Sequence, residues 1–193
     1  MRSLIWYESL NERDYMYLLE IDPDVISYST QPFKISYILD KKVRWYTPDF
    51  LVQRKSKQQI VEIKPSCWND DEKNVRKFSV IAANLRSEGQ NFVIITDEMM
   101  SQGYLLNNIK LLYRYAQIHV KLQNLIICHQ YFQNKLSVPL NLAIKDLQNL
   151  GINKAILLKL IFLGFLTTDL IQQINDNSLL CLSSPSYLGM KND

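Results

Sequence analysis

The chain has 193 residues, a length that allows one large domain or two small ones, each with its own core. Hydrophobic residues make up 47% and charged residues 21%, as in soluble globular proteins, and the net charge of +3 is too small to indicate a polyanion partner by itself. The three cysteines are widely spaced and form no CxxC pair, which argues against a structural zinc site and against a disulfide framework.

No segment has the pattern of a membrane span or a signal peptide. The most apolar stretch, residues 155–166, is interrupted by Lys159 and is far shorter than the roughly 20 residues that cross a bilayer. Acidic side chains already appear at Glu8 and Glu12, where a secretory signal would be apolar. We therefore expect a cytoplasmic protein with reduced thiols and no membrane contact.

The first half of the chain predicts a mixture of helices and strands. A first helix is expected to begin at Ser9, because Ser9 and Glu12 have the spacing of a capping box, and to end at the Asp22-Pro23-Asp24 sequence. Period-two and apolar patterns predict the strands, and turn residues mark their ends. The further elements are strands at 33–39, 43–52, 59–64 and 92–96, and helices from Asp70 or Asp71 to 87 and over 105–115.

The composition changes after about Tyr115. Residues 116–193 contain only six Lys and Arg and four Asp and Glu, and are rich in Leu, Ile and Asn. This change places a domain boundary there, with domains at 1–115 and 116–193. Helices are expected near 118–133, 140–150 and 153–163, followed by short extended pieces at 165–171 and 179–182. Helix, turn, helix, hairpin is the order of a winged helix, and a plain helical cap on the first domain fits equally well.

Positive charge is concentrated between residues 34 and 57. That stretch has seven Lys and Arg against two acids, Asp40 and Asp49. The pattern alone fits a solvated hairpin with charged edges as well as a nucleic-acid surface. It gains weight because it flanks the acidic residues described next.

Three side chains of the stretch 48–64 are expected to share one face of a sheet. If residues 54–57 form a four-residue loop, the strands on either side pair antiparallel and place Asp49 opposite Glu62. Lys64 is two residues beyond Glu62 and therefore lies on the same face. Two carboxylates and one ammonium group converge there.

Such a cluster suits phosphodiester hydrolysis. Two close carboxylates repel each other unless a cation lies between them or one is protonated, and hard divalent ions prefer oxygen ligands. Mg²⁺ or Mn²⁺ polarises a phosphoryl oxygen and lowers the pKa of bound water. Lys64 can orient that water or neutralise charge that builds up on the phosphate. A surface hairpin with cross-strand ion pairs is the simpler alternative.

Glu12 is a further acidic candidate. It lies on the same helix face as Met16 and Leu19, which is expected to face the core, where a carboxylate needs a partner. It can complete the acidic cluster, or it can merely close the capping box with Ser9, and the two roles are compatible.

These residues resemble the PD-(D/E)xK nuclease superfamily, and their succession resembles the TnsA family of transposon endonucleases. The resemblance covers roughly residues 3–100. The segments that carry it are ESLNERD (8–14), LLE (18–20), DPDV (22–25), QP (31–32), YTPDFLV (46–52), VEIKP (61–65) and FVIITD (92–97).

The resemblance implies a restriction-endonuclease-like α/β fold, a mixed sheet flanked by helices, with a smaller winged-helix-like, mainly helical C-terminal domain. It implies Mg²⁺-dependent cleavage of the non-transferred strand at the 5′ ends of a transposon, beside the DDE transposase TnsB and the AAA+ ATPase TnsC. It assigns catalysis to Glu12, Asp49, Glu62 and Lys64. Metal binding falls to the three acids and the backbone carbonyl of Ile63, and the C-terminal domain contacts the regulator.

Two other functions remain open at this point. A stand-alone restriction or repair nuclease of the same superfamily would cut DNA without partners. A non-catalytic DNA-binding adaptor with a relic site would have lost a catalytic residue, whereas Glu12, Asp49, Glu62 and Lys64 are all present.

Overall fold

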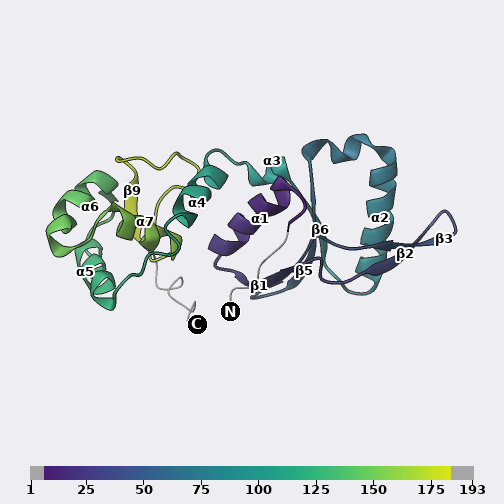
Figure 1. Ribbon diagram of the computed structural model, residues 1–193, viewed down its shortest axis with the longest axis horizontal. Helices are drawn as coiled ribbons and strands as arrows, with labels where there is room; N and C mark the ends of the chain where they lie inside the picture. The colour runs from purple at the N-terminus through teal and green to yellow at the C-terminus, as the bar shows by residue number, and fades with distance from the viewer. Residues whose placement is uncertain (1–6, 184–193) are drawn as a thin grey trace. The chain divides into compact units, whose positions relative to one another are not determined.

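The computed structural model describes residues 7–183, which form two compact units divided between Ser101 and Gln102 (Figure 1). This division falls before the expected boundary after residue 115. Helix α4 (Leu105–Tyr113) belongs to the second unit because its buried Asn108 donates hydrogen bonds to the carbonyls of Leu170 and Gln172. Within residues 7–183, every helix is too short or too polar to cross a membrane.

The first unit is built on a four-stranded mixed sheet. Its strand order is β1 (Val25–Thr30), β4 (Phe50–Arg54), β5 (Gln58–Lys64) and β6 (Phe92–Thr96). β1 and β5 both pair antiparallel with β4, whereas β5 and β6 run parallel. The sequence predicted β5 and β6 closely but did not predict β1. β5 therefore has a neighbour on each side, and it is the strand that carries Glu62 and Lys64.

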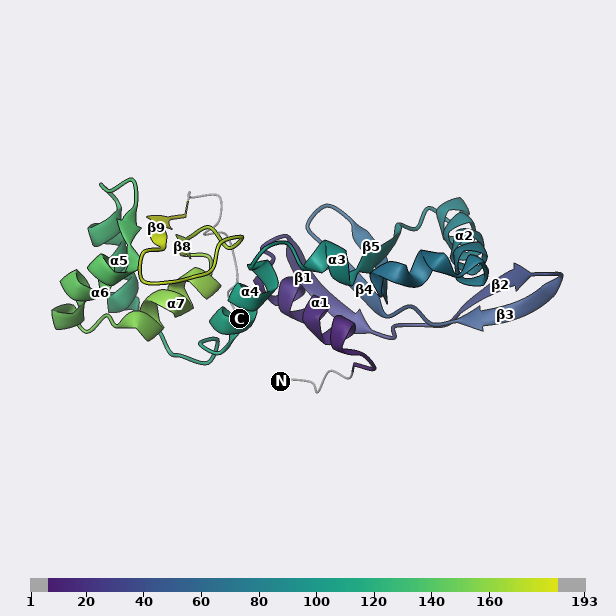
Figure 2. The same ribbon diagram turned by 90° about the horizontal axis from the view of Figure 1, so that it is seen from above.

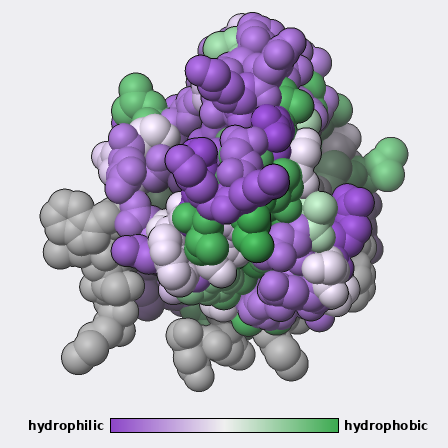
Figure 3. Space-filling model, turned by 90° about the vertical axis from the view of Figure 1, so that its right-hand side faces the viewer, coloured by the Kyte–Doolittle hydropathy of each residue, from purple (hydrophilic) through white to green (hydrophobic). Residues whose placement is uncertain are grey.

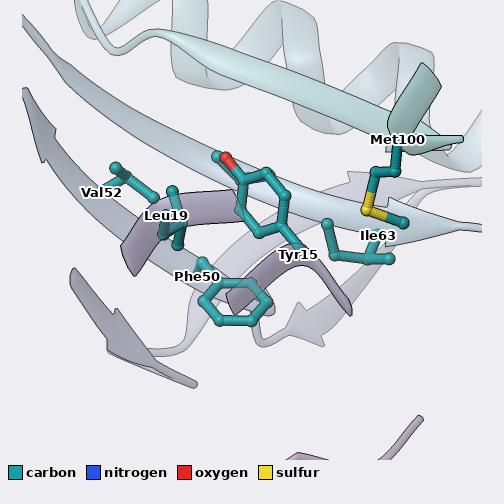
Figure 4. Packing of buried hydrophobic residues seen from close by; sticks show 7 residues of the cluster. Tyr15, Leu19, Phe50, Val52, Ile63 and Met100 are labelled. Carbon is teal, nitrogen blue, oxygen red and sulfur yellow. The ribbon is translucent and has the colours of Figure 1, made fainter. Parts of the chain in front are cut away.

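Helices cover both faces of this sheet, as expected. On one face α1 (Leu10–Ile21) buries Tyr15 and Leu19 against Phe50 and other apolar side chains of the sheet (Figure 4). On the other face α2 (Glu72–Ser87) belongs to a second core. The members of that core from α2 and the sheet are Ile60, Phe78, Ile81 and Leu85.

The sequence signals at the helix ends are confirmed. Ser9 caps α1 by accepting a hydrogen bond from the backbone N–H of Glu12, and Asp71 caps α2 by accepting from the N–H of Lys73. Each cap satisfies a backbone donor that the first helical turn leaves without a partner. Two short helical segments were not predicted and flank the larger elements: a 3₁₀ turn at Ser66–Asp70 and α3 at Asp97–Met100.

A separate hairpin leaves the sheet between β1 and β4. It consists of β2 (Ile35–Leu39) and β3 (Lys42–Tyr46), and Figure 2 shows it extending beyond the sheet beside α2. The prediction of one strand over 43–52 was wrong, because residues 47–49 break it at Pro48 into β3 and β4. At the hairpin tip Asp40 and Lys41 have φ angles of 53° and 60°, the left-handed backbone that a two-residue hairpin turn demands.

The second unit is mainly helical. Its described elements alternate helices with very short strands, and β9 pairs with both β7 and β8 in the order β7-β9-β8. The predicted helices are confirmed, and Asn153 caps α7 as expected. The elements after α4 are α5 (Leu122–Phe132), β7 (Val138–Pro139), α6 (Leu140–Leu147), a 3₁₀ turn (Gln148–Leu150), α7 (Lys154–Phe162), β8 (Leu166–Thr167) and β9 (Leu179–Leu182).

Candidate active site

The antiparallel register brings Asp49 and Glu62 together. Leu51 pairs with Ile60 and Phe50 pairs with Val61, as the sequence predicted, so one further step along the strands sets Asp49 opposite Glu62. Asp49 lies in the bend before β4, where its Oδ2 accepts a hydrogen bond of 2.7 Å from the backbone N–H of Ile63. This bond holds the carboxylate against β5.

Glu62 is the most enclosed charge of the site. Its side chain is buried in the central strand, and the residue is only 3% exposed. Its Oε1 lies 2.6 Å from the Nζ of Lys64, and its Oε2 accepts a hydrogen bond from the Tyr46 hydroxyl. The Lys64 ammonium also lies over the ring of Phe78, 5.1 Å from the ring centroid. A buried carboxylate with partners on both oxygens keeps a single orientation.

Tyr46 is a site residue that spacing along the sequence did not reveal. It ends β3, in a different sheet from Glu62, so no strand register links the two. Its ring is buried against Phe78 and Phe92, and only its hydroxyl reaches the carboxylate. Burial, and then the charge of Glu62, raise the pKa of Tyr46, so the hydroxyl stays a donor. The sequence signals were a large amphipathic aromatic three residues before Asp49 and its place in the segment YTPDFLV that carries the family resemblance.

Asp49 has an unusual acidity for an aspartate. Burial, followed by the nearby charge of Glu62, raises the pKa of Asp49 to about 7, although the N–H of Ile63 and the charge of Lys64 act in the opposite direction. The site thus holds more negative charge than its own lysine balances. It favours either a proton or a cation near Asp49.

Glu12 lies near this pair without joining it. Its carboxylate accepts hydrogen bonds from the Ser9 hydroxyl (2.8 Å) and from the backbone N–H of Glu8 (2.9 Å), so it binds the residue before the cap rather than the N–H of Ser9 that a capping box uses. Its charge is the smallest of the influences that raise the pKa of Asp49. Across residues 7–183, no three His, Cys, Asp or Glu side chains stand at metal-ligand spacing. The acidic pair and Glu12 are neighbours rather than a preformed set of three ligands.

The donor chemistry of the pair fits a hard divalent cation. Mg²⁺ takes one or two carboxylates and keeps waters for its other positions, so a pair does not need a complete protein cage. The raised pKa of Asp49 shows that its negative charge lacks compensation, which a cation would supply. Asp49 and Glu62 are therefore suitable ligands, with the Ile63 carbonyl and Glu12 as the further candidates.

The pKa of Asp49 predicts a pH-dependent penalty on folding. In the unfolded chain this group titrates near 3.8, whereas in the folded protein it titrates near 7. The folded state therefore holds the extra proton, and the contribution of Asp49 to metal-free stability becomes increasingly unfavourable as pH rises from about 4 to about 7. At pH 8 Asp49→Asn should stabilise the first unit by on the order of 2 kcal/mol, a figure reduced for partial exposure to water.

Urea unfolding in EDTA, followed by tryptophan fluorescence, measures this effect, because Trp45 and Trp68 both belong to the first unit and the second unit contains no tryptophan. The gain from Asp49→Asn should be small at pH 4 and largest at pH 8. Stability curves of wild type and variant that run parallel across this pH range would contradict the assignment.

One family model matches part of the chain. The family model described as "TnsA-like endonuclease N terminal" matches residues 22–97, which span the sheet, the hairpin and α2. The match includes Asp49, Glu62 and Lys64 but begins after α1 and so leaves out Glu12. No curated protein matches the chain. The segment that holds the carboxylate pair and its lysine is therefore similar to the N-terminal part of TnsA-like endonucleases.

Proposed function

We propose that this protein is the DNA endonuclease subunit of a heteromeric cut-and-paste transposase, and that it hydrolyses phosphodiester bonds at the 5′ ends of the non-transferred strand with Mg²⁺ or Mn²⁺. The observation that carries the proposal is the convergence of Asp49, Glu62 and Lys64 within the matched segment. The active-site acids and lysine are all present, which favours an enzyme over a non-catalytic adaptor.

Each side chain of the site has a separate proposed role in hydrolysis. A bound divalent ion would polarise the phosphate and lower the pKa of an attacking water. Asp49 and Glu62, with the Ile63 carbonyl and Glu12, would hold that ion. The Ile63 N–H fixes one oxygen of Asp49 and leaves the other available. Tyr46 and Lys64 orient Glu62, and Lys64 brings positive charge to the phosphate as negative charge builds up on it.

Glu12 is proposed as the third acid of the site. The first turn of α1 already places it close enough to influence Asp49. To bind a metal, its carboxylate would exchange the Ser9 hydroxyl and the Glu8 N–H for the ion. The Ser9 hydroxyl would continue to cap the helix through the N–H of Glu12, so this exchange leaves α1 capped.

Cleavage of DNA that carries transposon ends, with and without the partner transposase, tests the proposal. Mg²⁺ should support nicking at the 5′ ends, EDTA should stop it, and added Mn²⁺ should restore it. Complete cleavage at unrelated sites by the isolated protein would instead identify a stand-alone restriction or repair nuclease. No cleavage with Mg²⁺ or Mn²⁺, with the partners present, would refute the nuclease.

We further propose that the second unit is a winged-helix-like domain that docks the AAA+ regulator TnsC. Its order of helix, strand, two helices and hairpin supports the winged helix. Its few Lys and Arg are a poor basis for holding duplex DNA, which depends on several phosphate contacts. Along α5, Leu122 and Ile126 are exposed one helical turn apart, as a protein contact requires.

Removing residues 102–193 should abolish capture of the ATPase, because the proposed docking surface lies on this unit, and should leave metal binding by the remaining residues intact. A pull-down with purified ATPase measures the first effect, and Mn²⁺ titration calorimetry measures the second. Full-affinity capture by the fragment 1–101 would place the regulator on the nuclease unit instead.

A further inference from the structure

The β2–β3 hairpin has one buried face and one exposed face. Paired residues of antiparallel strands share a face, so Ile35 and Tyr46 lie on one side and Ser36 and Trp45 on the other. The side with Tyr46 belongs to the core that contains Phe78 of α2. The other side has no covering element among residues 7–183.

That uncovered face is apolar. Trp45 is 68% exposed, and the cross-strand pair Ile38 and Val43 is 67% and 66% exposed. Figure 3, which views the protein from the hairpin's end, shows hydrophobic side chains at the surface among a larger hydrophilic area. Burial of three large apolar side chains would stabilise the protein, but these three are exposed to water on one face. An exposed apolar patch of this kind is typical of a contact surface.

The hairpin also carries four positive charges. Lys34 precedes β2 and Lys41 occupies the turn, whereas Lys42 and Arg44 alternate with Val43 and Trp45 along β3 and so lie, exposed, on the opposite face of the ribbon. The acid of the turn, Asp40, is paired with Arg76 of α2 at 2.7 Å. Within the described part of the chain, the four hairpin cations form no ion pair. A narrow ribbon with one apolar face, and with cations at its base, at its tip and on its other face, complements a stack of bases between two phosphate chains.

We propose that the β2–β3 hairpin enters the major groove of duplex DNA, with Trp45, Ile38 and Val43 against the base edges, with Lys34 and Lys41 on the flanking phosphates, and with the long side chains of Lys42 and Arg44 reaching phosphates from the opposite face. A two-stranded ribbon fits this groove, which is about 12 Å wide. Thymine methyl groups and base edges there offer apolar contacts that phosphates do not. This inference rests on the proposed DNA substrate and adds the surface that reads it.

The salt dependence of affinity separates base contacts from phosphate contacts. Trp45→Ala should weaken binding by on the order of 10-fold at every salt concentration and leave the log–log slope unchanged, because an apolar contact releases no counterions. Trp45→Phe should retain most of the affinity. Replacing Lys41, Lys42 and Arg44 together with alanine should instead flatten the slope by about one unit for each phosphate that is no longer neutralised. The measurement is anisotropy of a fluorescein-labelled duplex with the full-length protein in EDTA.

Ile26→Ala is the matched control for an exposed apolar side chain, because Ile26 is 64% exposed in β1, outside the hairpin. It should bind like wild type. Methyl green, a major-groove ligand, should compete with the protein, and netropsin, a minor-groove ligand, should not. Equal affinity of Trp45→Ala and wild type, with both folded by circular dichroism, would overturn the inference and leave the face to a protein partner. Absence of binding by wild type itself would count against the nuclease proposal instead.

Discussion

Asp49→Ala should abolish strand cleavage in Mg²⁺ while the fold remains intact. Asp49 lies in a bend outside the strands, and burial and the charge of Glu62 both disfavour its ionised carboxylate. Removing this carboxylate should therefore reduce the stability of the fold very little. The same carboxylate is a central ligand of the proposed metal. A metal site contributes several kcal/mol to lowering the barrier, so the rate should fall by more than about 10³-fold.

Single-turnover cleavage of a labelled duplex measures this loss, and circular dichroism and thermal melting check the fold. Asp70→Ala is the matched control, because Asp70 is an exposed acid at the end of the 3₁₀ turn after β5. It should cut at the wild-type rate. Undiminished Mg²⁺-dependent cleavage by Asp49→Ala would remove Asp49 from the site.

Lys64→Ala should slow cleavage by roughly 10²-fold or more, the effect of losing one preorganised electrostatic group. In the proposed mechanism Lys64 acts on the reaction rather than on the binding of DNA. Its ammonium is fixed 2.6 Å from Glu62 and over the ring of Phe78, whereas the hairpin cations lie on the exposed ribbon. DNA affinity should therefore change by much less than the cleavage rate.

Binding and rate must be measured on the same duplex, by anisotropy and by single-turnover cleavage. Lys55→Ala is the matched control, because Lys55 is an exposed cation in the loop between β4 and β5. Its removal should leave the rate of chemistry unchanged. If Lys64→Ala reduced affinity and rate by the same factor, Lys64 would be an ordinary phosphate contact.

Local pattern was sufficient to predict the part of the site that lies on adjacent strands. The short loop before Gln58 determines which residues of β4 pair with which residues of β5. Because side chains alternate between the two faces of a strand, this pairing also determines which side chains share a face. Asp49, Glu62 and Lys64 follow from it without further information. The Ser9 cap and the ends of α1 and α2 are equally local signals, because each depends on residues within one turn.

The remaining features depend on contacts between segments far apart in the chain. The pairing of Tyr46 with Glu62 arises because the hairpin base packs on α2, and no spacing rule records that packing. The inclusion of α4 in the second unit depends on Asn108, which bonds to a loop about 60 residues later.

The hairpin has a topological property with consequences for engineering. Thr30, where it departs, is the register partner of Phe50, where it returns, and the N–H of Gln31 donates to the carbonyl of Asp49 at 2.9 Å. The two ends of the hairpin are thus paired with each other at its base. A longer or shorter tip would leave the order of the strands in the main sheet unchanged. Because loop-closure entropy grows slowly with length, added residues between Leu39 and Lys42 should cost little stability. The length of the β2–β3 hairpin can therefore be changed without affecting the proposed hydrolysis, as long as Tyr46 at its base still donates its hydrogen bond to Glu62.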